Sequence, residues 1–132
     1  MDGEVKSILE KHQWQDRLLL IFAGEQQRQV LKEQLQLFHK EQRACLERNL
    51  KIYQITSQQV VLPNGEMGED GLASPFYRLF TQQKSAFSLL LIGKDGGVKL
   101  ERKELTDPSY IFTLIDGMPM RRREMRQQQG KG

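Results

Sequence analysis

Residues Phe87 to Arg102 read Phe-Ser-Leu-Leu-Leu-Ile-Gly-Lys-Asp-Gly-Gly-Val-Lys-Leu-Glu-Arg and predict a β-hairpin. The apolar run Phe87–Ile92 is typical of a strand that is buried on both faces. The turn falls at Asp95-Gly96-Gly97, because glycine adopts positive φ without a Cβ clash. In Val98–Arg102 apolar and charged residues alternate, so the returning strand has one solvent-facing side.

Two further strands are predicted upstream, separated by a helix. Arg17–Ala23 is apolar throughout and resembles a buried central strand, whereas Leu50–Ile55 alternates and resembles an edge strand. Between them, Glu25 to Glu47 has helical periodicity and predicts one long helix. Its apolar stripe includes Leu31, Leu35, Phe38 and Cys45.

Three shorter helices complete the chain. Residues 2–13 predict a short N-terminal helix, and Phe76–Phe80 predicts another, with Ser74 as its N-cap. Asp107-Pro108 is a typical helix start, because the carboxylate caps the first turn and proline lacks only an N–H that would have no partner there.

This order of elements predicts an α/β fold. A strand–helix–strand unit forms a parallel pair with a right-handed crossover, and the hairpin and the last helix then complete a three-layer sandwich. We therefore expect a thioredoxin-like architecture, with a central mixed sheet of four strands and flanking helices. The two apolar strands should be central and the two alternating strands should be edges.

Length and composition indicate one globular domain. The chain has 132 residues, of which 28% are charged and 38% are hydrophobic. We divide it into an N-terminal helical extension (1–13), a thioredoxin-like domain (14–120) and a basic C-terminal tail (121–132). The net charge is +3, and arginines of the tail account for it. The body is close to neutral, so a nucleic-acid-binding face across the domain is not expected.

The residues that usually carry redox or metal chemistry are scarce. Cys45 is the single cysteine, which excludes an intramolecular disulfide and a cysteine-based metal cage. Its place on the apolar stripe indicates a buried side chain, although a reactive or peroxidatic thiol is the alternative. His12 and His39 are 27 residues apart and have no carboxylate or cysteine at metal-ligand spacing, so we predict surface or helix-face histidines, no metal site and no cofactor.

The sequence also bears on location. No signal peptide is visible, and no apolar run approaches the ~20 residues of a membrane-spanning helix. We therefore predict a cytoplasmic protein without a membrane segment.

Three segments carry a family resemblance: Arg17–Ala23, Leu91–Leu100 and Leu114–Arg126. In sequence, order and spacing they resemble a thioredoxin-like domain family of unknown function. That domain is the last domain of the extracellular sushi-repeat-containing proteins, also occurs in the matrix protein equarin and forms single-domain proteins in bacteria. The resemblance implies a bacterial single-domain member, binding rather than turnover, and a secreted or periplasmic location as an alternative.

The same resemblance allows a check on redox chemistry. Redox thioredoxins carry Cys-x-x-Cys where this chain has Ala23-Gly24-Glu25-Gln26. They carry a cis-proline before the hairpin, where this chain has Ser85-Ala86-Phe87. Dithiol exchange is therefore not expected, because it requires a thiolate.

The candidate binding site lies where the hairpin turn and the end of the last helix meet at one pole of the predicted fold. We expect one surface there, formed by Lys94, Asp95, Met118, Met120, Arg121 and Arg122. The alternative is structural, with arginines meeting the negative end of a helix and Asp95 pairing with one of them.

Three functions remain open from the sequence. The first is a non-catalytic module that binds an unknown protein partner. The second is a thioredoxin-like or peroxiredoxin-like oxidoreductase that uses Cys45 or a non-standard site. The third is weak, salt-sensitive attraction of the arginine tail to nucleic acid or anionic lipid.

Overall fold

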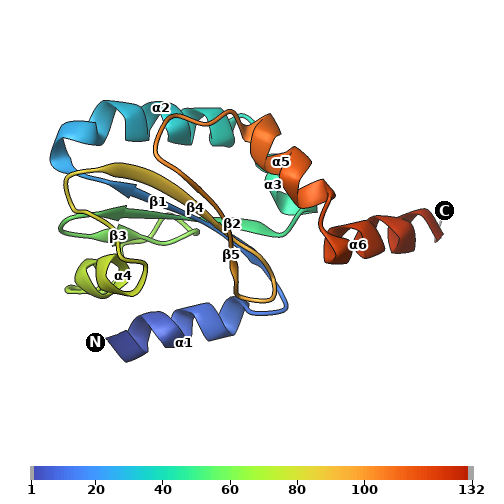
Figure 1. The fold of residues 1–132 in the computed structure, drawn as a ribbon, viewed down its shortest axis with the longest axis horizontal. Helices are drawn as coiled ribbons and strands as arrows, with labels where there is room; N and C mark the ends of the chain where they lie inside the picture. The colour runs from blue at the N-terminus through green and yellow to red at the C-terminus, as the bar shows by residue number, and fades with distance from the viewer. Residues whose placement is uncertain (1, 131–132) are drawn as a thin grey trace.

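A mixed β-sheet forms the centre of the computed structural model, which describes residues 2–130 (Figure 1). Its strand order is β3-β2-β1-β4-β5. The five strands are β1 (Arg17–Ala23), β2 (Leu50–Thr56), β3 (Val60–Val61), β4 (Phe87–Ile92) and β5 (Val98–Arg102).

Strand β1 organises the sheet. It runs parallel to β2, with Leu20 opposite Tyr53, and antiparallel to β4, with Leu20 opposite Leu90. Strand β4 then pairs antiparallel with β5, which confirms the predicted hairpin and the central position of both apolar strands.

The predicted number of strands was wrong. The sheet has five strands rather than four, because Val60–Val61 folds back antiparallel onto Gln54 and Ile55 of β2. Strand β2 is therefore not an edge strand along its whole length. A two-residue strand carries too short a pattern to be distinguished from a loop by periodicity.

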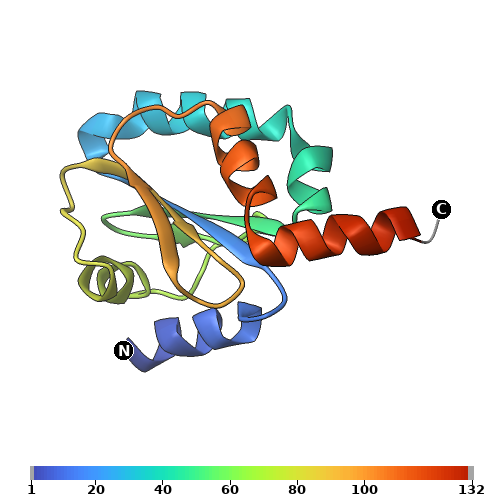
Figure 2. The ribbon, with the colours of Figure 1, turned by 45° about the vertical axis from the view of Figure 1, so that its right-hand side comes forward.

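Helices cover both faces of the sheet. Helices α2, α3 and α5 lie on one side, α1 and α4 lie on the other, and α6 projects away from the body (Figures 1 and 2). Their bounds are α1 Asp2–His12, the 3₁₀ turn η1 Glu25–Gln27, α2 Arg28–His39, α3 Gln42–Glu47, α4 Ala73–Leu79, α5 Pro108–Asp116 and α6 Pro119–Gly130.

Two helix predictions need correction. The single helix expected from Glu25 to Glu47 is interrupted, because α2 ends at His39 and α3 begins at Gln42. Neither glycine nor proline marks the break. The turn redirects α3 against β2, where Cys45 and Leu50 share one core. Helix α4 begins at Ala73, and no side chain caps it, so Ser74 is not its N-cap.

The predicted start of the helix after the hairpin is confirmed. Asp107 caps α5, since its Oδ1 accepts a 2.9 Å hydrogen bond from the Ser109 N–H, and Pro108 is the first helical residue. Helix α6, in contrast, was not predicted: it spans most of the segment (121–132) that the sequence analysis treated as a basic tail.

The core has two halves, one on each face of the sheet. Every residue of β1 and of β4 is buried, and alternate side chains enter opposite halves. Leu20 and Phe22 pack toward α1 and α4, whereas Leu19 and Ile21 pack toward α2 and α5. Each buried side chain of this size contributes about 1.5–3 kcal/mol, so this pair of strands holds the layers together.

A polar side chain of α2, Gln34, is buried in this core. Gln34 of α2 is fully buried and forms two hydrogen bonds with the main chain of Thr106. Its Nε2 donates to the Thr106 carbonyl at 2.7 Å, and its Oε1 accepts from the Thr106 N–H at 2.8 Å. The amide therefore supplies the partners that the buried N–H and C=O of Thr106 need, and it holds the segment that leads into α5.

We predict that Gln34→Leu lowers the free energy of unfolding by about 2–4 kcal/mol, because it leaves the buried N–H and C=O of Thr106 without partners. Urea denaturation followed by circular dichroism measures the change. The matched control is Gln36→Leu, an exposed position on the same helix, which should shift the midpoint little. Equal midpoints for the two variants would contradict this role of Gln34.

Candidate functional site

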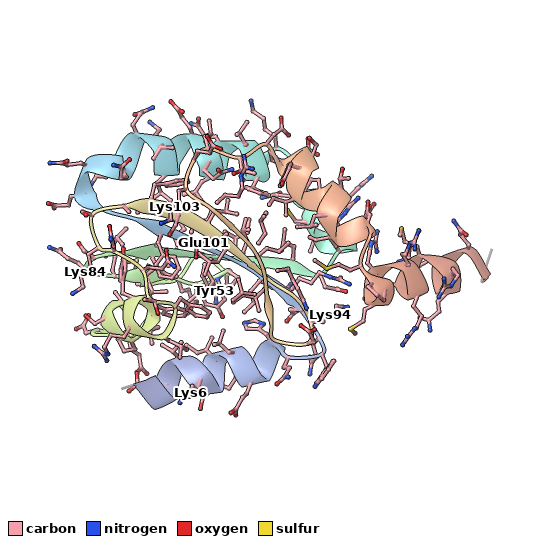
Figure 3. The ribbon with its side chains drawn as sticks, in the orientation of Figure 1. Lys6, Tyr53, Lys84, Lys94, Glu101 and Lys103 are labelled. Atoms are coloured by element: carbon pink, nitrogen blue, oxygen red, sulfur yellow. The ribbon has the colours of Figure 1, made fainter. Side chains whose placement is uncertain are left out.

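The hairpin turn and α6 meet in a buried ionic cluster around Glu124. Lys94 is only 9% exposed, and its Nζ donates to Glu124 Oε2 at 2.8 Å and to Asn49 Oδ1 at 2.9 Å. Arg17 is 1% exposed and donates to Glu124 Oε2 at 3.1 Å and to the Arg48 carbonyl at 2.8 Å. Figure 3 shows Lys94 at the end of the molecule from which α6 departs.

A second carboxylate, Asp116, extends this cluster. It accepts hydrogen bonds from Arg48 Nη2 at 2.8 Å and from Arg121 Nε at 3.1 Å. Arg121 also donates to the Glu47 carbonyl at 3.0 Å, and its Nη1 lies 3.8 Å from Glu124 Oε1. The pole therefore holds four cationic side chains around two carboxylates, and the contacts join β1, the hairpin turn and the last two helices.

The excess of positive charge lowers the pKa of both carboxylates. Burial alone would raise the pKa of Glu124, but the hydrogen bonds from Arg17 and Lys94 outweigh it, and the pKa lies below its ordinary value. Burial acts in the same way on Asp116, where Arg48 and Arg121 bring the pKa down. Both groups are therefore ionised at neutral pH and stabilise the fold as anions.

The structure places the six predicted site residues in two classes. Lys94 and Arg121 are buried and turn inward, toward Glu124 and Asp116. Arg122 is exposed, and Met118 and Met120 are half-buried.

The structural alternative expected Asp95 to pair with an arginine, and this expectation was wrong. Asp95 forms a 2.7 Å contact with Lys99 and accepts from the Gly97 N–H at 2.9 Å. The bond from Lys99, followed by that from Gly97, lowers the pKa of Asp95. A lysine four residues ahead on the same hairpin is simply nearer than any arginine of α6.

Sequence reasoning missed a second polar cluster, which lies on the other side of the sheet. His12 Nδ1 is 2.8 Å from Asp16 Oδ2, and His12 Nε2 is 2.6 Å from the Tyr53 hydroxyl oxygen. Because a carboxylate only accepts, Nδ1 donates to Asp16, and in the neutral imidazole Nε2 then accepts from the Tyr53 hydroxyl. The three side chains line a pocket of about 950 Å³ between α1, β2 and the 62–72 segment.

The order carboxylate–imidazole–hydroxyl resembles the arrangement that activates a hydroxyl in some hydrolases. Here, however, burial and then the charge of Asp16 raise the pKa of Tyr53 to about 12. The phenol therefore stays protonated at neutral pH, and the contacts serve to hold α1 on the sheet. The spacing of His12 and Asp16 was visible in the sequence, but the distant partner Tyr53 was not.

The comparisons give one match. The model of a family described as "Domain of unknown function (DUF4174)" matches residues 8–124, from α1 to Glu124. The chain belongs to the DUF4174 family. No curated protein and no solved structure matches it. The resemblance to sushi-repeat-containing proteins and equarin remains a prediction.

In this DUF4174 domain, the positions that were compared with a redox pair leave little room for a reactive side chain. Gly24 follows β1 and donates its N–H to the Ala86 carbonyl at 3.2 Å. A Cβ at Gly24 would lie 2.6 Å from the Lys84 carbonyl oxygen and 2.9 Å from the Ser85 Cα. The main chain of residues 84–86 therefore occupies the space that a side chain at position 24 would need.

Cys45 is buried, as predicted, with 7% of its surface exposed. Burial is the main reason that its pKa rises to about 11, although Arg48 opposes the shift. The thiol therefore carries very little thiolate at neutral pH, and thiolate is the reactive form. His39 is exposed at the end of α2, where its Nδ1 lies 3.0 Å from Gln42 Nε2.

Within residues 2–130, no group of three or more His, Cys, Asp or Glu side chains is arranged to hold a metal ion. In the same part of the chain, no helix has the length and apolar character needed to cross a membrane.

We predict that Glu124→Gln destabilises the DUF4174 domain by about 2–3 kcal/mol at pH 7, because Arg17 loses its anionic partner in a buried place. The lowered pKa of Glu124 adds a pH dependence. Its stabilisation is complete above the ordinary value of 4.5 and is lost as the pH falls through the lower folded-state pKa.

Urea denaturation between pH 7 and pH 3 measures both effects. The wild type should lose stability on acidification more steeply than Glu124→Gln, which lacks this titration. Glu10→Gln, at an exposed position, is the control and should follow the wild type. If Glu124→Gln unfolds at the wild-type urea concentration at pH 7, the cluster does not hold the fold.

Proposed function

We propose that this DUF4174 domain is a non-catalytic protein-binding module on a thioredoxin-like scaffold. The topology supports the scaffold: a parallel β1–β2 pair is connected through α2 and α3, and an antiparallel hairpin adds to the other side of β1. Helix α5 follows the hairpin, in the order that the thioredoxin fold requires. A shared scaffold does not by itself carry a shared activity, so the function is argued from the surface.

The observation that carries the proposal is the exposed face of α6. Arg122, Arg123 and Arg126 are exposed and form no ion pair with any residue that the structure describes. Their neighbour Arg121 points inward to Asp116 and Glu47, so the start of the projecting helix is held to the body from within. Half-buried Met120 and Met125 lie on the same helix and offer adaptable apolar contact.

This arrangement separates the six candidate residues by role. Lys94 and Arg121 anchor the pole, whereas Arg122, with Met118 and Met120 beside it, is available to a partner. Asp95 belongs to the hairpin turn through its contact with Lys99. The proposed partner is a protein with an acidic surface, because three unpaired arginines on one short helix attract carboxylates and offer bidentate bonds.

We predict that Arg122→Glu with Arg123→Glu weakens partner binding by about tenfold or more and leaves the fold intact, because both side chains are exposed. The measurement is quantitative mass spectrometry of proteins that co-purify with the chain from its own cells. A circular-dichroism melt of each variant verifies the fold.

The matched control is Lys84→Glu with Lys103→Glu, an equal change of charge at two exposed positions away from α6 (Figure 3). An unchanged set of partners for the arginine variant contradicts the proposal. Loss of duplex DNA binding at moderate salt, with protein partners unchanged, assigns the arginines to nucleic acid instead.

The oxidoreductase alternative makes a different prediction, which Cys45 tests. Because its thiol is buried and has a pKa of about 11, Cys45 should react with Ellman's reagent at pH 8 much more slowly than the same residue in urea-unfolded protein. Cys45→Ser should leave the response to hydrogen peroxide unchanged. Rapid reaction in the folded state, together with peroxide consumption that Cys45→Ser abolishes, would favour the enzyme.

A further inference from the structure

A second surface, formed by no residue of α6, has a different character. A groove of about 1010 Å³ runs between α2, α3, strand β2 and the loop at residues 62–65. Its lining is largely apolar and includes Leu31, Leu35, Leu46, Leu50, Ile52 and Leu62. Leu46 is 66% exposed, which is unusual for leucine and leaves an apolar side chain facing solvent at the groove.

Cationic side chains border this apolar floor. Arg28, Lys32 and Lys40 line the groove from the α2 side, and Lys51 lines it from β2. Among the described residues, no aspartate or glutamate lines it. Lys32, Lys40 and Lys51 form no ion pair within residues 2–130, and Arg28 has only a loose 3.6 Å contact with the exposed Glu25. The cations are therefore available to an external anion.

The spacing of these cations has a regular geometry. Positions 28, 32, 36 and 40 are four residues apart and all line the groove, with Gln36 as the one uncharged member. Residues four apart on a helix form a row with one member per turn, so Arg28 to Lys40 spans about 18 Å. Leu31 and Leu35 form a parallel apolar row beside it.

We propose that this groove binds an amphipathic α-helix of a partner protein, whose apolar stripe is flanked by aspartate or glutamate. Helix-in-groove recognition uses anchors at i, i+3, i+4 and i+7, and a length of about 18 Å accommodates roughly three turns. Acidic residues spaced four apart on the partner meet the row Arg28, Lys32 and Lys40, while its leucines meet Leu35 and Leu46.

Charge distribution selects this occupant over two others. A fatty acid would fit the apolar floor, but its single carboxylate satisfies only one of four cations spread along both sides. Nucleic acid would meet the cations, but it would bury no apolar group on the leucines. An acidic amphipathic helix satisfies both features of the groove.

The experiment uses two synthetic, fluorescein-labelled peptides of about 14 residues that form helices with the same leucine stripe. One carries glutamates beside the stripe, and the other carries lysines at the same positions. Fluorescence anisotropy with the full chain should give affinity for the glutamate peptide at least about tenfold higher than for the lysine peptide. Methyl NMR shifts should change at Leu35, Leu46 and Ile52.

Variants locate the site. Lys32→Glu with Lys40→Glu should lower the affinity for the glutamate peptide about tenfold, and Leu46→Asp should also lower it. Both variants should fold, because the three side chains are exposed. The control is Lys6→Glu with Lys84→Glu, two positions that do not line the groove and are labelled in Figure 3, and it should leave binding unchanged.

Three outcomes overturn the proposal. Equal affinity for the two peptides removes the charge argument. Saturation of the groove by one fluorescent fatty acid, with no peptide-induced shifts at Leu46, assigns it to a lipid. Concentration-dependent dimerisation that Leu46→Asp abolishes assigns it to a second copy. The arginines of α6 do not line the groove, so Arg122→Glu with Arg123→Glu should leave peptide binding unchanged, and the two proposals can fail separately.

Discussion

The contact of Glu124 with Arg17 and Lys94 is the interaction on which this end of the domain depends. It joins three elements far apart in the sequence: the first residue of β1, the turn of the hairpin and the last helix. Arg17 is almost completely buried, and its guanidinium would be very costly there without an anion. Asp116 is likewise the anionic partner of Arg48 and Arg121. The helical C-terminal segment is therefore a structural part of the pole.

Much of the fold could be predicted because its signals are local. The apolar runs of β1 and β4 alone indicate two central strands, and Asp107-Pro108 marks the start of α5 without any tertiary information. The missed features depend on distant contacts. The break between α2 and α3 has no glycine or proline, and Gln34 looks like any surface glutamine until Thr106 lies beside it. Tertiary packing overrides helical periodicity at such places.

The meeting of the hairpin turn with the segment after α5 was predictable, but the orientation of the individual side chains there was not. Topology brings the hairpin turn and the end of the last helix to one pole, and the structure joins Lys94 and Arg121 there through Glu124. The sequence could not tell which of the adjacent arginines turns inward, because that depends on the rotation of α6 about its axis. Arg121 meets Asp116, and Arg122, one residue later, faces solvent.

The placement of the charges, rather than their sum of +3, gives the domain two cationic surfaces. Asp116 and Glu124 are occupied inside the pole, and Asp95 is occupied within its own hairpin. Such carboxylates neutralise internal cations and cannot screen the arginines of α6 or the lysines beside the groove. A protein can thus be nearly neutral in total and still present unpaired positive charge at particular places, and charge at particular places is what guides a partner to a surface.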